Sequence, residues 1–361
     1  MLWEGSAIKL LRLGLYTFSH FCVDFSCFYL LFFWYSSGTH SSQTVTLGFL
    51  AYNVIAFGFQ PFIGYFCDTY RKIPAGVFGC LLLIAGLLFM PFPAGSIILI
   101  GLGNACFHIE GGIDSLRHSG GKMARSGVFV SSGALGVALG SLAGKSGSMS
   151  VYVPICILLL CLVLLCILYI KRAEPDCVIP AFTVAKPGLK PGTVILIASV
   201  SILIRSYAGL IIPLQWRTTA VLFVFPAIGA FLGKASGGFI ADSIGAKKAS
   251  VSSLLIAAVL LVFGYMDPWI YLAGILLFNI SMSVTLCAIA SVMPLNPGLA
   301  FGITTLALLC GNAPTFFAAA RPAPLIFAAL TVVSAACLYY ILIGKVKPNE
   351  ETYKKNKLHD V

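Results

Sequence analysis

Long apolar stretches fill most of the chain, and short polar or charged segments separate them. Each stretch is close to the roughly 20 apolar residues that a helix needs to cross a bilayer. Turn residues and charges divide the chain into twelve such stretches. They predict an all-α polytopic membrane protein whose transmembrane helices cover residues 12–36, 45–66, 74–92, 95–113, 126–144, 149–170, 192–213, 219–241, 249–266, 268–290, 298–318 and 323–344.

The longest polar interruption lies in the middle of the chain. Residues 171–191 are rich in proline and charge, and such a composition is typical of a linker. We therefore expect two pseudo-symmetric six-helix halves, 1–170 and 192–344, joined by a cytoplasmic linker. Residues 345–361 are polar and predict a cytoplasmic tail.

The basic residues predict the orientation of the chain, because cytoplasmic loops carry an excess of Lys and Arg. With both termini inside, the outer loops hold only Lys145, Arg217 and Arg321 of the 23 Lys and Arg, while Arg205 and Lys234 fall within helices. We expect Lys234 to reach the cytoplasmic interface with its long side chain. The pattern predicts a multi-pass protein of the plasma membrane with both termini in the cytoplasm.

The composition excludes several classes of protein. Hydrophobic residues make up 59% of the chain and charged residues 10%, whereas about 25% of a soluble domain is charged. A soluble enzyme is therefore excluded, and the net charge of +11 follows from the basic loops rather than from binding to nucleic acid. The sequence has no C-x-x-C, H-E-x-x-H or P-loop motif, so we expect no metal, no cofactor, no catalysis and no use of ATP.

Two loops repeat one pattern. Residues 64–72 read GYFCDTYRK and residues 238–248 read GFIADSIGAKK, so that Asp68 and Asp242 each follow a glycine by four residues. The basic residues of the two copies are Arg71, Lys72, Lys247 and Lys248. Both copies fall on the predicted cytoplasmic side, at equivalent places in the two halves.

This repeated loop, together with twelve helices and a central linker, resembles the major facilitator superfamily of transporters. The resemblance implies two halves that rock around a central cavity. It implies that Asp68 and Asp242 cap neighbouring helices and that the basic residues beside them are gating residues. Glu110 or Asp114 would be the acid that Arg71 meets.

Shorter stretches are similar to the fosmidomycin resistance subfamily of efflux proteins. They include His20-x-x-x-Asp24, Gln60-Pro61-x-x-Gly64, Phe107-His108-Ile-Glu110 and Arg205-Ser206-Tyr207. This resemblance implies proton-coupled efflux of a drug or metabolite by antiport. The implied partners are a small-molecule substrate, protons and the lipid bilayer, and the implied state is a monomer.

Charged residues within the spans are candidates for the site, because a charge at the bilayer centre costs at least about 2.5–3.5 kcal/mol. Asp24 and Arg205 lie at similar depths in the first and seventh helices. We expect them to face each other across the cavity, either to couple protons or substrate or as a static ion pair. Arg205 also favours an anionic or polar cargo.

Further polar residues lie near these charges. His20 is one turn from Asp24 on the same helix face and either shuttles protons or bonds a backbone carbonyl. Asn104 and His108 share a face of the fourth helix, and Tyr207 is a weaker candidate. We expect residues 111–112, two glycines, to end the fourth helix, which would place Asp114 near the cytoplasmic mouth.

Two other functions stay open at this point. An importer of a small polar or anionic nutrient would have the same fold, because the fold does not fix the direction of transport. A membrane sensor that transports nothing would also share it. The sequence does not identify the substrate.

Overall fold

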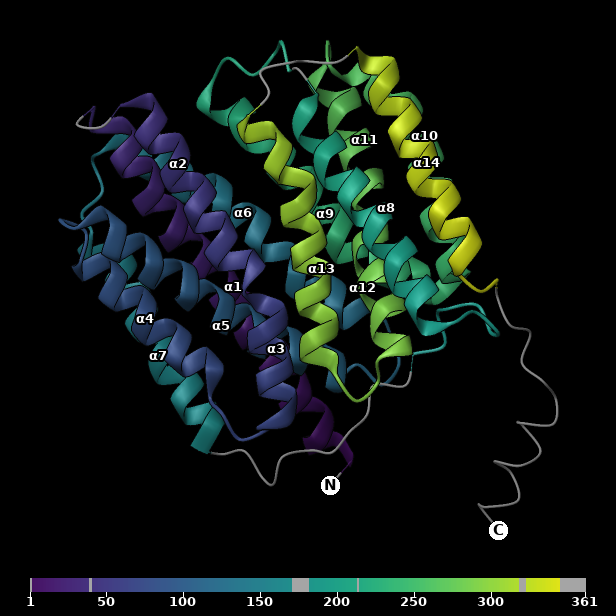
Figure 1. Cartoon of the computed structure of the whole chain (residues 1–361), viewed down its shortest axis with the longest axis horizontal. Helices are drawn as coiled ribbons and strands as arrows, with labels where there is room; N and C mark the ends of the chain where they lie inside the picture. The colour runs from purple at the N-terminus through teal and green to yellow at the C-terminus, as the bar shows by residue number, and fades with distance from the viewer. Residues whose placement is uncertain (1, 39–40, 171–181, 213, 318–322, 345–361) are drawn as a thin grey trace.

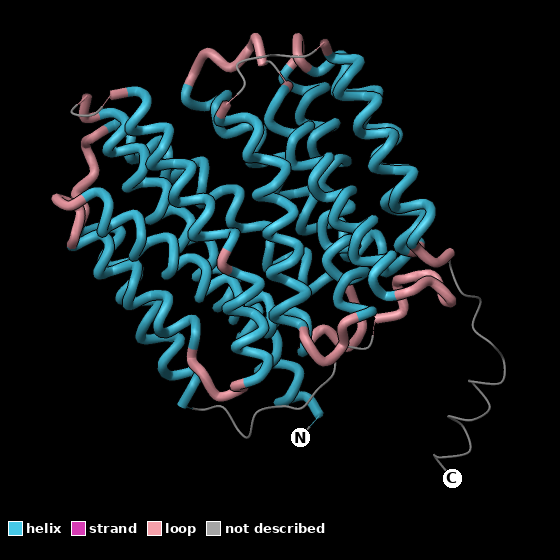
Figure 2. Tube along the Cα trace, in the orientation of Figure 1, coloured by secondary structure: helices cyan, strands magenta, loops and turns pink. Residues whose placement is uncertain are grey.

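The computed structural model describes residues 2–38, 41–170, 182–212, 214–317 and 323–344, which form a bundle of helices. Figure 1 shows their arrangement, and Figure 2 shows that the connecting loops gather at two opposite ends. The elements are α1 (Leu2–Ser36), α2 (Ser42–Asn53), η1 (Val54–Gly58), α3 (Gln60–Thr69), α4 (Ala75–Leu88), α5 (Pro93–Arg117), α6 (Ala124–Ser146), α7 (Tyr152–Ile170), α8 (Pro191–Ile211), α9 (Ala220–Ile244), α10 (Ala246–Gly264), α11 (Pro268–Asn279), α12 (Ser281–Val292), α13 (Pro297–Asn312), η2 (Ala313–Phe316) and α14 (Pro324–Ile341).

Eleven helical segments of the described residues are long and apolar enough to cross a membrane, and the shorter α4 is a twelfth apolar helix. Three of the eleven consist of two or three elements in sequence. The π-helical turn η1 joins α2 to α3, α12 continues α11, and η2 extends α13. The prediction of an all-α membrane protein is therefore confirmed.

The helices form two groups. In Figure 1 the elements α1 to α7 lie on the left and α8 to α14 on the right. Of the expected linker, residues 171–181 lie outside the described residues, as does the expected tail 345–361. The described end of the linker is tied to the right-hand group, because the Val184 carbonyl accepts a hydrogen bond from the Ile343 amide at 3.0 Å. The two halves and their boundaries stay a prediction.

One loop end of the bundle carries the repeated loops. We call it the basic end, because the loop after α3 holds Arg71 and Lys72 and the start of α10 holds Lys247 and Lys248. Helix α1 also begins there. We call the opposite end the outer end, a name taken from the predicted orientation of the chain.

The prediction that two glycines end the fourth helix is wrong. Helix α5 continues through Gly111 and Gly112 to Arg117. A Cβ atom added at Gly111 would clash with the ring of Phe129, and one at Gly112 would clash with the ring of Phe301. These glycines leave room for two aromatic rings packed against the helix, so tertiary packing overrides their weak helix propensity.

Candidate functional site

A cavity of about 640 Å³ lies between the two groups of helices. Its wall combines α1, η1, α5 and α6 of one group with α8, α9, α11, α12 and α13 of the other. The lining reaches from the interior of the bundle to the loop between α8 and α9, at the outer end. Its histidines and charged members are His20, Asp24, His108, Arg205, Arg217 and Lys234.

Helices α1 and α5 are joined by a ladder of polar contacts that ends at this cavity. Arg12, Tyr16, His20 and Asp24 are spaced four apart on α1, so they lie on one face of the helix. Their partners on α5 run in the opposite direction. The contacts are Arg12 Nε to Asp114 Oδ1 at 3.0 Å, Tyr16 Oη to Glu110 Oε1 at 2.6 Å, His20 Nε2 to His108 Nε2 at 2.8 Å, and Asn104 Nδ2 to Asp24 Oδ1 at 3.0 Å.

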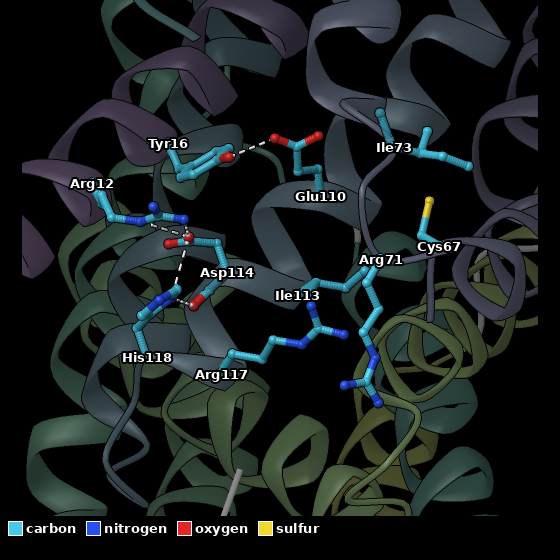
Figure 3. A pocket seen from close by; sticks show the side chains of 11 residues that line it. Arg12, Tyr16, Cys67, Arg71, Ile73, Glu110, Ile113, Asp114, Arg117 and His118 are labelled. Atoms are coloured by element: carbon cyan, nitrogen blue, oxygen red, sulfur yellow. Dashed lines mark hydrogen bonds and ion pairs between the residues drawn. The ribbon is translucent and has the colours of Figure 1, made fainter. Parts of the chain in front are cut away.

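The end of the ladder near the basic end holds two carboxylates with several partners each (Figure 3). Asp114 bonds both Arg12 and His118. Glu110 accepts from Tyr16 and also from the Gly76 amide at 2.6 Å, in the first turn of α4. Sequence reasoning missed Arg12, Tyr16 and His118 as partners of these acids, although the four-residue spacing on α1 was a signal for the first two.

The contacts of His20 and His108, the histidine pair, point to one hydrogen shared between the two rings. The Nδ1 atom of His20 lies 2.7 Å from the Phe129 carbonyl oxygen, and Nδ1 of His108 lies 2.9 Å from the Asn104 carbonyl oxygen. A carbonyl oxygen only accepts, so each Nδ1 carries a hydrogen. The two Nε2 atoms then lie 2.8 Å apart with their lone pairs facing each other. This contact is attractive only if one of the two atoms carries a proton.

Asp24 is placed to balance the charge of a proton on the histidine pair. Its Oδ2 lies 3.2 Å from Nε2 of His20, and its Oδ1 lies 3.6 Å from Nε2 of His108. Asp24 is only 8% exposed and each histidine 5%. Burial in low dielectric strengthens this attraction. The fold therefore builds a buried site of two histidines and a carboxylate in the cavity wall.

The same three residues are close enough to be considered for a metal ion, which the sequence did not predict. One ligand atom from each of His20, Asp24 and His108 lies within 4.8 Å of the others. However, two nitrogens bound to tetrahedral zinc at about 2.0–2.1 Å stand about 3.3 Å apart. The observed 2.8 Å fits a shared proton better than a shared metal.

Asp24 and Arg205 both line the cavity, but they do not pair within the described chain. Asp24 contacts His20, His108 and Asn104. The Arg205 guanidinium, on α8, donates to partners on α12, which are Ser281 Oγ at 2.6 Å, Thr285 Oγ1 at 3.0 Å and Met282 Sδ at 3.2 Å. The expectation of a static ion pair is therefore wrong, because equal depth in two helices does not bring their side chains together.

Two other predictions about the cavity also change. Lys234 lines the central cavity rather than extending to the cytoplasmic interface. On α8, the lining residues include Ser206 but not Tyr207, because successive residues of a helix point about 100° apart. Ser206 Oγ donates to the Leu308 carbonyl at 2.8 Å and contacts Asn312.

The aspartates of the repeated loops join the two groups of helices at the basic end. Asp68 accepts from the Gly298 and Leu299 amides at 3.0 and 2.9 Å, at the start of α13. Asp242 accepts from the Met123 and Ala124 amides at 2.9 and 3.0 Å, at the start of α6. Each carboxylate thus caps unsatisfied N–H groups and meets the positive end of a helix dipole.

The backbones also approach closely at this end. A Cβ atom added at Gly302 of α13 would lie 2.5 Å from the Pro61 Cα and N atoms of α3, and one at Gly238 of α9 would lie 2.5 Å from the Ala124 Cα of α6. The basic end is therefore tightly packed, whereas the cavity lies beyond it and reaches the outer end.

The basic residues of the repeated loops have varied surroundings. The Lys247 ammonium lies 3.6 Å from the Tyr339 ring centroid, within one group of helices. The Lys72 carbonyl accepts from Tyr169 at 2.6 Å, and the Lys248 side chain is exposed. Figure 3 shows Arg71 beside Arg117 in the small pocket near Asp114. Their role in gating stays a prediction.

Comparison with solved structures identifies the fold. The chain is similar to the E. coli fucose:proton symporter FucP, with a TM-score of 0.66 and 13% identity over 92% of this chain and 98% of that chain. It is also similar to a bacterial homologue of the iron transporter ferroportin in its outward-facing state, with a TM-score of 0.59 and 15% identity over 92% and 96% of the two chains. FucP in an outward conformation gives a TM-score of 0.59 at 14% identity over 90% and 96%.

The chain thus has the fold of the major facilitator transporters, with its elements in two sets around a central cavity. No protein-family model and no curated protein match the chain. The finer resemblance to the fosmidomycin resistance subfamily stays a prediction.

Proposed function

We propose that this protein is a secondary active transporter that moves a small organic molecule by alternating access, coupled to protons. The observation that carries the proposal is the buried site of the histidine pair and Asp24 in the wall of the central cavity. Histidine side chains take up and release protons in proton-transfer sites, and this pair lies in the wall of the cavity that a cargo would enter. Similarity in fold to a fucose:proton symporter adds support.

The packing at the basic end supports the alternating part of the proposal. The two caps made by Asp68 and Asp242 hold α13 and α6 against the opposite group of helices. Transport requires that these contacts break while contacts at the outer end form. A hydrogen-bonded cap is a contact of modest strength, about 0.5–2 kcal/mol, so two of them permit both states.

Two directions of transport are proposed. Efflux by proton antiport follows from the resemblance to fosmidomycin resistance proteins. Import together with a proton is favoured by a feature of the cavity: Arg205, Arg217 and Lys234 line it, and the carboxylate of Asp24 already faces the histidine pair. An anion bound beside these cations would strengthen proton binding rather than compete with it, which is the condition for symport.

A pH-sensitive dye in the lumen of proteoliposomes tests proton coupling and direction together. Purified protein is reconstituted, and neutral sugars, amino acids, organic acids and fosmidomycin are added outside. We expect one class to change the lumenal pH: acidification identifies symport and alkalinisation identifies antiport. His108→Gln should abolish the pH change because the pair can no longer share a proton, whereas Lys186→Gln, at an exposed position outside the cavity, should keep it. Solute flux without any pH change would contradict proton coupling.

A further inference from the structure

We infer that the cargo of the central cavity is a small organic anion with an apolar body, and that Arg205 and Lys234 anchor its anionic group. The inference rests on the proposed transport function and names the substrate class for it. It depends on the charges of the cavity wall, on how Arg205 is held, on the outer mouth and on the apolar lining.

The cavity wall has an excess of positive charge. Arg205, Arg217 and Lys234 line it, and none of them forms an ion pair with a carboxylate among the described residues. The one carboxylate in the wall, Asp24, is engaged by the histidine pair and by Asn104. Cations within a membrane are retained where they pair or serve a pathway, so a bound anion is the partner that the cavity lacks.

Arg205 is oriented without being neutralised. The residue is only 2% exposed, and its guanidinium donates to the hydroxyl groups of Ser281 and Thr285 and to the Met282 sulfur. All three acceptors are uncharged, so the full positive charge stays available to the cavity. A guanidinium held in a fixed direction binds a carboxylate or phosphonate with two parallel hydrogen bonds. Lys234 lies in the same wall on α9 as a second, compact positive charge.

The outer mouth of the cavity also carries positive charge. The Lys145 ammonium lies 4.5 Å from the ring centroid of Phe223, and the Arg217 guanidinium carbon lies 3.9 Å from the same centroid. Lys145 comes from α6 and Arg217 from the loop before α9. The sequence placed only three basic residues in outer loops, and two of them meet here. Like charges at the rim of an apolar cleft raise the local concentration of anions.

The rest of the cavity wall determines which shape and polarity of the uncharged part of a cargo would fit. Aromatic rings from both groups of helices line the cavity, among them Phe28, Phe57, Phe278 and Phe301. A volume of about 640 Å³ lies within the range for pockets that bury small organic ligands, about 300–1,000 Å³. A cargo with an apolar ring or chain and one anionic group matches both parts of the wall.

Binding to matched probes tests this inference in the full-length protein. We would measure the ligand-induced rise in melting temperature with benzoate and phenylphosphonate as anions, benzamide as the neutral probe and benzylamine as the cation. We expect the anions alone to stabilise the protein. Arg205→Gln and Lys234→Gln should each weaken anion affinity by about 10- to 100-fold, Arg205→Lys should restore part of it, and Lys186→Gln should leave it unchanged.

The outcomes separate this inference from the proposed function. Stabilisation by benzamide equal to that by the anions, or no stabilisation by either anion, overturns the anionic cargo. Anion binding that Arg205→Gln and Lys234→Gln both leave unchanged overturns the assigned site. If a neutral solute changes the lumenal pH of proteoliposomes while anions do not bind, proton-coupled transport stands and the anionic cargo falls. If anions bind as expected but no solute changes that pH, the anion site stands and the proton coupling fails.

Discussion

Asp24→Asn is expected to abolish proton-driven accumulation of cargo while leaving the protein folded. Asparagine keeps the shape of the side chain but removes the negative charge 3.2 Å from His20 Nε2. At an effective dielectric constant near 20, a charge pair at about 4 Å contributes about 4 kcal/mol. The variant therefore removes the counter-ion that a proton on the histidine pair needs. The measurement is cargo accumulation in proteoliposomes under an imposed pH gradient.

The matched control for this variant is Asp267→Asn. Asp267 is also a carboxylate, but it caps α11 at the outer end, where its Oδ1 accepts from the Trp269 and Ile270 amides. We expect this variant to keep proton-driven accumulation. Equal melting temperatures for the two variants would show that folding is not the cause of any difference. Full proton-driven transport by Asp24→Asn would mean that the proton binds elsewhere.

Gly302→Leu is expected to stop transport by preventing closure of the basic end. A Cβ atom at this position would lie 2.5 Å from backbone atoms of Pro61 and 2.6 Å from the Gln60 carbonyl carbon. Backbone atoms of α3 cannot move aside as a flexible side chain would, so α3 and α13 must separate. The protein would then stay open at the basic end. Hydrogen–deuterium exchange should rise at the Gly298 and Leu299 amides, which Asp68 holds in the closed arrangement.

Gly14→Leu is the control for introducing a leucine into a helix. Gly14 lies in α1, and a Cβ atom there would meet nothing within 4 Å. We expect normal transport and unchanged exchange at the start of α13. If Gly302→Leu transported at the normal rate with unchanged exchange, the tight contact between α3 and α13 would not belong to the transport cycle.

Local patterns in the sequence predicted the fold well. The apolar stretches define helices because a membrane allows few other structures, and the structure confirms them. The repeated loops pointed to Asp68 and Asp242, and both side chains cap helix starts in the opposite group. These features depend on residues close together in the chain, which a single sequence displays directly.

The site was harder to predict, because it depends on contacts between distant segments. His20 and His108 are 88 positions apart, and nothing local shows that their helices meet face to face. Depth alone left a static ion pair of Asp24 and Arg205 as one alternative, but the rotation of each helix decides its contacts, and residues of α12 bond Arg205. For the same reason, the sequence did not predict that Lys234 lines the cavity, and it predicted too early an end for α5.

The protonation of the histidine pair is the most direct test of the central claim. Nitrogen-15 solid-state NMR of the full chain in lipid bilayers, with the signals assigned through His20→Gln and His108→Gln, reports which ring nitrogens carry hydrogen. At neutral pH we predict both Nδ1 atoms protonated and one further proton shared by the two Nε2 atoms, with that proton lost in Asp24→Asn. A proton-coupled site would be contradicted if the wild type showed two neutral rings with no shared proton. That result would have to hold over the whole range from pH 5 to 8, in which histidine normally titrates.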